Sequence, residues 1–401
     1  MRCAGYATVI VFLLALVIAP AATAAVPTTP EEVQAVAGDV LAEEIISFME
    51  AEHCGGTGDH LSRADLQDAA LNYPEYPRRI VDSTGKTITI VRPLTRIVAY
   101  NSHWVTPLHQ EDKIVGVANS AVRAAVINPY ALGKINIGGG GPTFPDIEKI
   151  YECDPDAIIT YVTLGPGDDF FVDKMPPSVK VIRMDFLEPS YLREEILKIG
   201  YLLDCEEEAA RYVAWHDRYV DEIKERTAAI PDDERIRVFI DVGASGGADR
   251  RTASEGQYMH THCTDAGGIN VAADTVEAKT GVVNTEWIAQ QNPDAILGLC
   301  YAGGYETDDP AELADHYSDL LGQKILTFTP AVKNNKVYII SYRYAYGLQY
   351  PAALATIAKW FYPDRFADLD PEAINQEYID RFHGVDYDVT EQGVFTYPDR
   401  R

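Results

Sequence analysis

The sequence predicts an α/β protein made of two lobes with parallel-type sheets and one long helix between them. Two observations lead to this prediction. Short apolar runs alternate with helical segments on both sides of the middle of the chain, a pattern typical of parallel sheets covered by helices. A long helical stretch without strand signals separates the two series. The length of 401 residues is sufficient for two lobes of ordinary size.

The chain begins with features of a secretory signal. Arg2 precedes an apolar run over residues 9–19, and small residues follow at 22–24. This order predicts a cleaved signal peptide over residues 1–25 and a protein that works outside the cytoplasm, secreted to the periplasm or the outer face of the membrane. An uncleaved N-terminal anchor is the alternative, because the apolar stretch can be extended to nearly membrane length. Cys3 precedes the apolar run, which argues against a lipoprotein.

The composition excludes some classes of partner. A net charge of −27 argues against binding to nucleic acid or to anionic membrane surfaces. The cysteines after the signal are few, odd in number and widely scattered, so we expect small buried side chains rather than a disulfide framework. They are Cys54, Cys153, Cys205, Cys263 and Cys300.

Residues 26–78 differ from the rest of the chain. Two helical segments flank a glycine-rich loop, an outline similar to a calcium hand. The slots that need carboxylates hold other residues, which argues against calcium: they are His53, Gly55, Thr57 and Ala64. We expect a helical spacer, and its role does not follow from the sequence.

An N-terminal α/β lobe is predicted over residues 79–188. It opens with a hairpin around a Ser-Thr-Gly turn, and four strand-like runs follow. These are "RIVAY", "KIVGVA", "DAIITYV" and "KVIRM".

A helical connection is predicted over residues 189–230. Ser190 can cap a first helix, and a second one runs from about 205 to 229, where Pro231 stops it. At about 1.5 Å per residue the second helix is about 40 Å long, which is more than one lobe needs.

A C-terminal α/β lobe is predicted over residues 231–363, from the runs "RVFIDV", "DAILGL" and "KVYII". The remaining residues, 364–401, are acidic and rich in tyrosine and are expected to form a tail.

Three motifs suggest catalysis or cofactor binding and fail on their context. Residues 243–247 match G-x-S-x-G, but no helix follows the serine as a hydrolase requires, so a loop is the better interpretation. His260 and His262 are two residues apart in a helix expected over 254–267, so they point to different faces and cannot share a metal. The run "IGGGGPTFPD" lacks the lysine of a phosphate loop and is expected to be a loose connection. The sequence therefore favours binding over catalysis, with no metal centre or cofactor of its own.

Four runs resemble the substrate-binding proteins of ABC importers, in the class that carries ferric siderophores, haem and vitamin B12. They are "TRIVAYNSHWVTPLHQEDKIVGV", "FPDIEKIYECDPDAIITY", "DAGGINVAAD" with "NTEWIAQQNPDAILGL", and "TPAVKNNKVYIIS". Each run is weakly specific, but all four occur in the family's order. The resemblance covers about residues 79–365.

The resemblance implies two lobes joined by one rigid helix, a ligand cleft between them and only a small closure on binding. It also implies an extracytoplasmic monomer that delivers a small-molecule metal chelate to an ABC permease and its ATPase. We expect a ferric siderophore-type complex first, a corrinoid second and haem third. An enzyme on the same scaffold and a surface or sensory binding module are the hypotheses from other classes.

Polar and aromatic residues that follow strands are the candidates for the cleft wall. The stretch "SYRYAYG" at 341–347 stands out, because tyrosine offers a flat face with a hydroxyl and arginine a fixed positive fork for chelate oxygens. Asn101, Thr163 and Leu164 also follow strands. The candidate ligand residues are Ser102, His103, Trp104, Tyr161, Arg250, Arg251, Tyr301, Tyr342, Arg343, Tyr344 and Tyr346. The alternative for the tyrosines after 341 is that they begin the next helix and pack in the core.

Glu148 and Glu286 are expected to contact the permease. Each precedes a Pro-Asp and an apolar strand at the corresponding place of its lobe. In the family, glutamates at these places pair with permease arginines. The alternative is that each carboxylate only favours the start of its helix.

Overall fold

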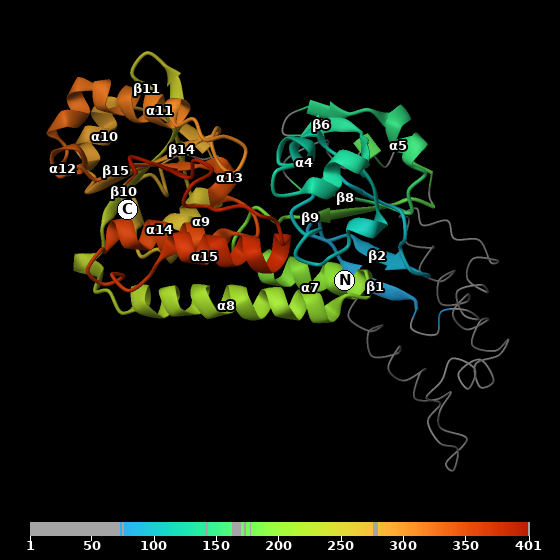
Figure 1. The fold of residues 1–401 in the computed structure, drawn as a ribbon. Helices are drawn as coiled ribbons and strands as arrows, with labels where there is room; N and C mark the ends of the chain where they lie inside the picture. Colours follow the sequence, from blue (N-terminus) through green and yellow to red (C-terminus); the bar gives the residue numbers. More distant parts are fainter. Residues whose placement is uncertain are drawn as a thin grey trace, which may run out of the picture. The chain divides into compact units, whose positions relative to one another are not determined.

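The computed structural model describes residues 73, 76–140, 143–162, 170–171, 174–176, 178–275 and 280–399. The predicted signal and nearly all of the predicted spacer lie outside these residues. From Arg78 onward the chain forms one compact unit, in which two α/β lobes lie side by side and share one long helix (Figure 1). None of the helices that the structure describes is long and apolar enough to cross a bilayer.

The first lobe contains a sheet of five parallel strands in the order β5-β4-β3-β8-β9. Every residue of β8 and β9 is buried, as expected for strands that are covered on both faces. The strands are β3 (Ile97–Ala99), β4 (Ile114–Val117), β5 (Ile135–Asn136), β8 (Ala157–Tyr161) and β9 (Lys180–Met184), with helices α4 (Asn119–Arg123) and α5 (Ile147–Cys153) and the 3-10 turns Glu111–Lys113 and Pro129–Gly133.

Two antiparallel hairpins accompany this sheet. The hairpin predicted at the start of the lobe is present as β1 (Arg78–Val81) and β2 (Thr87–Ile90). The glycine-rich run that the sequence treats as a loose connection instead forms β6 (Gly138–Gly140) and β7 (Thr143–Pro145). Tyr100 fixes this turn, because its hydroxyl donates to Thr143 O and accepts from Gly140 N.

The second lobe has a mixed sheet in the order β13-β11-β10-β14-β15-β16, with β12 beside β10. Its centre is parallel and its edges are antiparallel. The strands are β10 (Arg237–Gly246), β11 (Asp249–Ala253), β12 (Ile269–Asn270), β13 (Thr280–Asn284), β14 (Ala295–Cys300), β15 (Val337–Ser341) and β16 (Thr396–Tyr397). The helices are α9 (Tyr258–Asp265), α10 (Thr285–Gln291), α11 (Ala311–Gly322), α12 (Pro330–Lys333), α13 (Tyr342–Ala345) and α14 (Tyr350–Phe361), with a 3-10 turn at Lys324–Phe328.

Two expectations for this lobe need correction. The G-x-S-x-G stretch is not a loop, because β10 continues through it to Gly246 and pairs with β11. Helix α9 begins at Tyr258 rather than at Ser254, because the side chain of Gln257 accepts from Met259 N and caps it. The expectation that the two histidines of α9 do not share a metal agrees with their contacts: the ring nitrogens of His262 lie 2.8 Å from two backbone carbonyls, whereas Nδ1 of His260 lies 3.2 Å from an asparagine amide.

Helices α7 (Leu192–Leu202) and α8 (Glu206–Ala228) connect the lobes close to the predicted bounds. The buried residues of α8 recur every three or four positions, so one face packs along its length. At the first lobe, Arg78 pairs with Asp204 and Glu206 beside the start of α8. A 3-10 turn, Asp232–Glu234, follows the helix.

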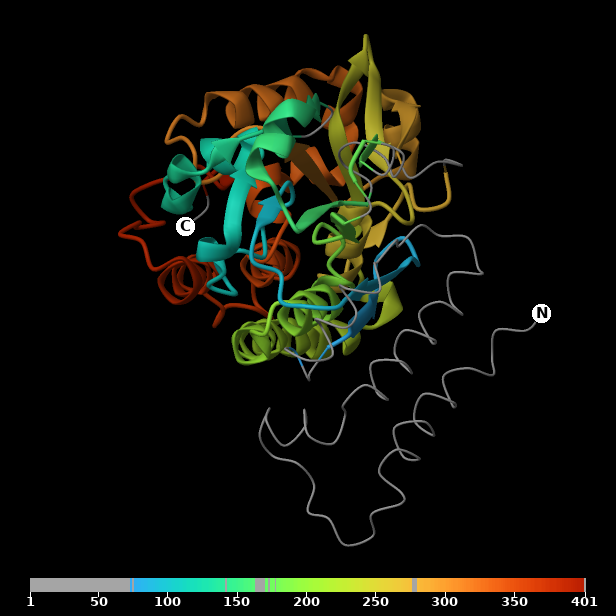
Figure 2. The same ribbon diagram turned by 90° about the vertical axis from the view of Figure 1, so that its right-hand side faces the viewer.

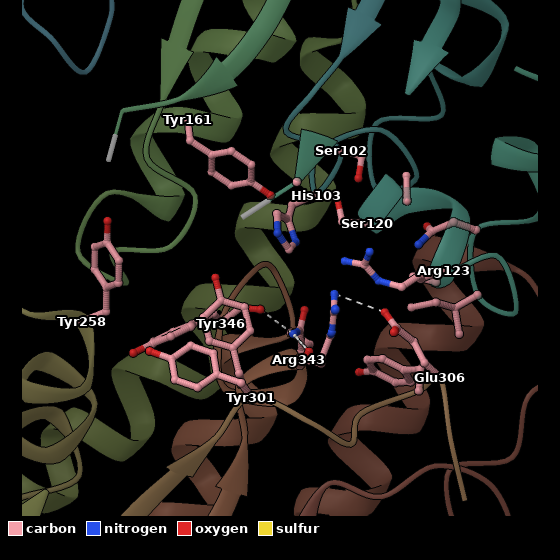
Figure 3. Close-up of a pocket in the computed structure, with 18 of the residues that line it drawn as sticks. Ser102, His103, Ser120, Arg123, Tyr161, Tyr258, Tyr301, Glu306, Arg343 and Tyr346 are labelled. Carbon is pink, nitrogen blue, oxygen red and sulfur yellow. Dashed lines mark hydrogen bonds and ion pairs between the residues drawn. The ribbon is translucent and has the colours of Figure 1, made fainter. Parts of the chain in front are cut away.

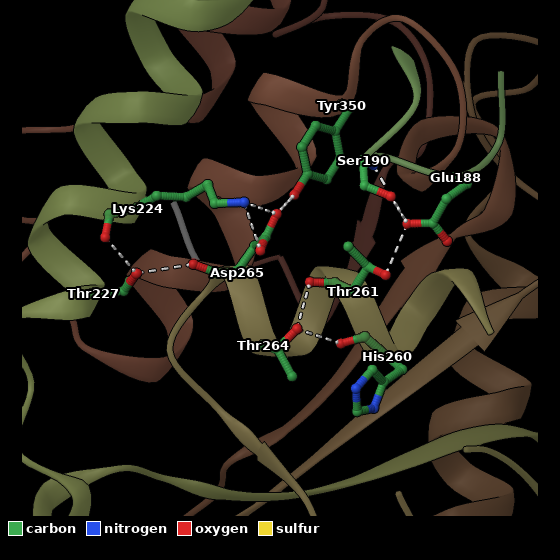
Figure 4. Close-up of polar contacts among 9 residues, drawn as sticks. All are labelled: Glu188, Ser190, Lys224, Thr227, His260, Thr261, Thr264, Asp265 and Tyr350. Carbon is green, nitrogen blue, oxygen red and sulfur yellow. Dashed lines mark hydrogen bonds and ion pairs between the residues drawn. The ribbon is translucent and has the colours of Figure 1, made fainter. Parts of the chain in front are cut away.

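Polar contacts fix the far end of α8 to the second lobe (Figure 4). Lys224 Nζ lies 3.0 Å from Asp265 Oδ1 at the end of α9, and Tyr350 donates to Oδ2 of the same carboxylate at 2.8 Å. Nearby, Glu188, at the end of the first lobe, accepts from Thr261 of α9 at 2.9 Å. The helix is therefore held at both ends.

Residues 364–401 are not a free tail. Helix α15 (Pro371–Tyr378) runs into a π-helical turn (Ile379–His383), and β16 then joins the edge of the second sheet beside β15. In Figure 2, α8, α14 and α15 are seen nearly end-on and close together. Trp215 of α8 contacts the rings of Tyr378 and Phe382, with centroids 5.5 and 5.3 Å away. Burial of these aromatic rings stabilises the packing of the segment on the connecting helix. The acidic composition of residues 364–401 gave no indication of this packing.

Candidate functional site

A cavity of about 760 Å³ lies between the lobes (Figure 3). Its walls come from segments that follow β3, β4 and β8 in the first lobe and β14 and β15 in the second. In open α/β sheets the carboxyl ends of strands are where crevices form, and this position follows the same rule. The C-terminal segment closes part of the wall with Tyr378 and His383.

Ser102 and His103 reach the cavity because the turn after β3 is fixed from behind. Asn101 N donates to Ile159 O at 3.0 Å, and the buried Trp104 donates its indole N–H to Asn101 O at 2.7 Å. Burial, with Arg343 and His383 nearby, lowers the pKa of His103 to about 4. His103 is therefore a neutral imidazole at physiological pH.

Tyr161 is the last residue of β8 and faces the cavity (Figure 3). Its ring packs edge-on against His103 and Tyr100, with centroid distances of 6.3 and 6.1 Å. Burial raises the pKa of its hydroxyl, so Tyr161 presents a neutral phenol that can donate or accept a hydrogen bond.

The first lobe also contributes a guanidinium that the sequence analysis missed. Arg123 ends the short helix α4 and points into the cavity, with Ser120 one turn earlier (Figure 3). Among the described residues, Arg123 makes no hydrogen bond or ion pair. The rule that selected residues after β3 and β8 also applies after β4, which ends at Val117, and could have found this arginine.

Four tyrosines cover the second-lobe wall. Tyr301 stacks on Tyr342 at 5.2 Å between centroids, and Tyr342 meets Tyr346 edge-on at 4.7 Å. Tyr258 continues the layer, 5.5 Å from Tyr346. The sequence analysis did not include Tyr258, because it lies on a helix and the strand that precedes it, β11, was taken for a loop. Burial raises the pKa of Tyr301, Tyr342 and Tyr346, so the layer is uncharged at physiological pH.

The stretch at 341–347 forms one helical turn at the end of β15. Ser341 caps it by accepting from Arg343 N at 3.2 Å, which places Tyr342 and Arg343 on the cavity side. Tyr344 points the other way, is buried, and shares a 3.0 Å hydrogen bond with Thr356 of α14. The core alternative therefore describes Tyr344, whereas Tyr342, Arg343 and Tyr346 line the cavity.

Gly347 ends this stretch for two reasons. Its φ of +112° is rarely adopted by other residues, and a Cβ there would lie 2.7 Å from Nδ1 of His103. The glycine therefore leaves room for the ring of His103 from the other lobe.

Arg343 is paired across the cavity wall with an acidic residue. Its Nη1 lies 3.2 Å from Oε1 of Glu306, in the loop after β14 (Figure 3). Burial raises the pKa of Glu306, while the positive charges of Arg343 and Arg123 act in the opposite direction. Glu306 follows β14 in the same loop as Tyr301, so the rule that selected residues after strands could have found it, but the sequence analysis extended the rule only to Tyr301.

Three further candidates lie away from the cavity. Trp104 is fully buried behind the turn that it anchors. Arg250 is buried on β11 in a two-bond ion pair with Asp241, and the neighbouring Arg251 is exposed on the same strand. Because β11 pairs with β10 where the sequence suggested a loop, neither arginine lines the cavity. Of the other residues considered, Asn101 is buried, and Thr163 and Leu164 lie outside the described residues.

Comparison with known proteins gives the family. The family model described as "Periplasmic binding protein" matches residues 99–344. The chain belongs to the periplasmic binding protein family. This confirms the suspected class, the two-lobed α/β fold and the prediction that the protein is a solute-binding transport protein rather than an enzyme. The members of this family work outside the cytoplasm as components of ABC transporters.

The individual proteins that match this chain have low sequence identity to it. The molybdate-binding protein MolA of Haemophilus influenzae is 27% identical over 347 residues, which cover 80% of this chain and 91% of MolA. The TroA-like periplasmic binding protein FepB of Veillonella parvula has a similar structure, with a TM-score of 0.64 and 23% identity over 80% of this chain and 99% of FepB. CeuE of Helicobacter pylori, solved as a nickel–histidine complex, has a TM-score of 0.61 and 16% identity over 79% of this chain and 98% of CeuE.

The periplasmic binding protein has no metal-ligand cluster among the described residues: no group of three or more His, Cys, Asp or Glu side chains comes together there. Cys153, Cys205, Cys263 and Cys300 are buried and form no disulfide, as expected, and Cys54 lies outside the described residues.

Glu148 and Glu286 lie at corresponding places of the two lobes. Glu148 is in the first turn of α5 and Glu286 in the first turn of α10, and both are exposed. Each helix begins at a residue whose side chain caps it, Asp146 and Asn284 respectively. Both glutamates are therefore accessible and held on rigid elements, and their contact with a permease stays a prediction.

Proposed function

We propose that this periplasmic binding protein delivers an anionic metal complex to its ABC permease and ATPase, with a ferric siderophore-type chelate as the first candidate. The observation that carries the proposal is the pair Arg123 and Arg343, which enter one cavity from opposite lobes. Guanidinium groups bind carboxylate and catecholate oxygens through paired hydrogen bonds. An anion between the lobes would be held from both sides.

The size and lining of the cavity favour a chelate over a small ion. A volume of about 760 Å³ is in the range of sites for drug-sized ligands. The tyrosine layer of the second lobe supplies flat apolar faces and hydroxyls, which suit the organic rim of a chelate. Corrinoid and haem are the alternatives of the same size class, and the neutral imidazole of His103 is suited to an axial position on haem.

A small oxyanion is the second candidate. It is favoured by the relative MolA, whose name gives molybdate as its ligand, and by the two arginines. Such an ion would contact Arg123 and Arg343 but leave most of the tyrosine layer without a partner.

The test is native mass spectrometry followed by titration calorimetry with ferric catecholate and hydroxamate complexes, cobalamin, haem and molybdate. We expect one ferric chelate to bind in a one-to-one complex. The double variant Arg123→Ala/Arg343→Ala should lose this binding, whereas Arg251→Ala, an exposed arginine outside the cavity, should keep it. Binding of molybdate alone would support the second candidate, and binding that the double variant retains would contradict the proposal.

A further inference from the structure

Glu306 is the one carboxylate among the described residues that line the cavity. Its Oε1 lies 3.2 Å from Nη1 of Arg343. The negative charge of Glu306 therefore lies beside a group that would bind an anionic ligand. Its side chain is 17% exposed and that of Arg343 25%, so the pair is partly shielded from water. A carboxylate in a site for anions opposes the ligand unless it has a role of its own.

The charges around Glu306 come from elements of both lobes. Arg343 of α13 and Arg123 of α4 carry positive charge. His103, in the turn after β3, and His383, in the π-helical turn, are neutral at physiological pH, because burial lowers the pKa of each to about 4.

The remaining titratable groups near this side of the cavity do not alter the balance of charge around Glu306. Tyr305, next to Glu306, and Tyr378 of α15 are buried phenols whose pKa burial raises, so they stay uncharged. Asp308 and Asp309 follow on the same loop, but they are exposed and do not line the cavity. With two arginines and one glutamate, the cavity carries a net charge of one positive unit.

We propose that Glu306 determines specificity by holding Arg343 as an internal counter-ion. The cavity then prefers complexes with one negative charge, and a ligand with two or more binds together with a proton that Glu306 takes from solvent. This inference rests on the proposed function, because it assumes an anionic ligand between the arginines.

The expected pH dependence follows from this coupling. A second negative charge on the ligand repels the Glu306 carboxylate and competes with it for Arg343, so the bound state favours the protonated acid. Because the complex then binds one proton more than the empty protein, affinity for dianions rises as the pH falls. The rise ends below the pKa of Glu306 in the empty cavity, where both states are protonated. Monoanions show a weaker dependence, since one arginine already matches their charge.

Two matched pairs of probes separate charge from size. Perrhenate and molybdate are tetrahedral oxyanions of similar size with one and two negative charges. The EDTA complexes of Co(III) and Ni(II) provide the same contrast at the size of a chelate. Each is titrated calorimetrically into the wild type and Glu306→Gln, in two buffers of different ionisation enthalpy, which reports proton uptake. Glu312→Gln, an exposed carboxylate on α11, is the control.

We expect the wild type to bind the monoanion of a pair more tightly and to take up a proton with the dianion. Glu306→Gln should tighten dianion binding by about tenfold or more near neutral pH, remove the proton uptake and change monoanion binding little. Glu312→Gln should behave as the wild type. Any ferric chelate found by the panel above is titrated in parallel.

Four results would overturn the inference. If Glu306→Gln changes the affinity for mono- and dianions equally, charge selection is absent. If it weakens all binding, Glu306 instead holds Arg343 in place for the ligand. If the chelate identified by the panel carries two or more negative charges and binds with an affinity that the substitution leaves unaltered, the inference fails while the proposed function stands. If no anion binds either protein, the proposed function fails, and this inference with it.

Discussion

Replacing Arg250 by methionine should destabilise the second lobe without acting through the ligand site. Arg250 is 1% exposed and its partner Asp241 is fully buried, and the two are joined by hydrogen bonds of 2.8 and 2.7 Å. Removing one member of a buried ion pair typically costs about 3–5 kcal/mol, because it leaves the other charge uncompensated. His316 also lies 2.6 Å from Asp241 and retains part of the compensation, so we expect about 3 kcal/mol.

The assay is equilibrium unfolding in urea, with Arg251→Met as the matched control. Arg251 is exposed on the same strand, so its loss should change the free energy of unfolding by less than about 0.5 kcal/mol. The double variant Arg250→Met/Asp241→Leu should recover part of the loss, because it removes both charges of the pair but leaves Asp319 and His316 without these partners. The reasoning is wrong if Arg250→Met costs less than about 1 kcal/mol, or if it abolishes ligand binding in a protein of unchanged stability.

Four further predictions follow from the structure. Burial alone would lower the pKa of His316, but the hydrogen bond and charge interaction with Asp241 raise it to about 9. The protonated His316 therefore contributes fully to stability below the unfolded-state pKa of about 6.5, and this contribution is lost as the pH rises through about 9. Thermal unfolding of the wild type should show this loss, and His316→Gln should flatten it. Arg343→Ala should weaken ligand binding by about 1.5–3 kcal/mol in calorimetry, as should Arg123→Ala, and unchanged affinity would remove either residue from the site. Small-angle scattering should show little change in radius of gyration on ligand binding, whereas a large compaction would mean a flexible hinge. Glu148→Ala with Glu286→Ala should impair uptake and spare ligand affinity, and normal uptake would mean that these glutamates only favour their helices.

The sequence predicts the strands of the two lobes well where every residue of a strand is buried. Strands β8, β9, β14 and β15 are buried at every position, and each was visible as a strand-like run. The hairpin of β10 and β11 was missed for two reasons. Its glycines and charged residues suggest a loop, and the pairing of the two strands depends on the rest of the sheet, which the local sequence does not show. Strand β16 was missed as well, because it has only two residues and forms a strand only by pairing with β15 at the edge of the sheet.

The cavity was predictable only in part. The rule that polar residues after strands form the wall found Ser102, His103, Tyr161, Tyr301 and Arg343, all of which line it. The rule cannot tell which side chains of a turn face outward, so it also included Trp104 and Tyr344, which pack in the core. Residues brought in by tertiary folding carry no local signal, as His383 of the C-terminal segment shows.

The C-terminal segment alters how the two lobes are joined. His383 Nδ1 lies 2.8 Å from Ile127 O, so the segment that packs on α8 through Phe382 also contacts the first lobe directly. A carbonyl only accepts hydrogen bonds, so Nδ1 of the neutral imidazole carries the proton in this contact. This hydrogen bond thus ties the lobes in addition to α8, and Ile127 and His383 themselves line the cavity. A cavity held in this way is largely preformed, so its fixed charges, Arg123, Arg343 and Glu306, rather than a large closure, are expected to select the ligand.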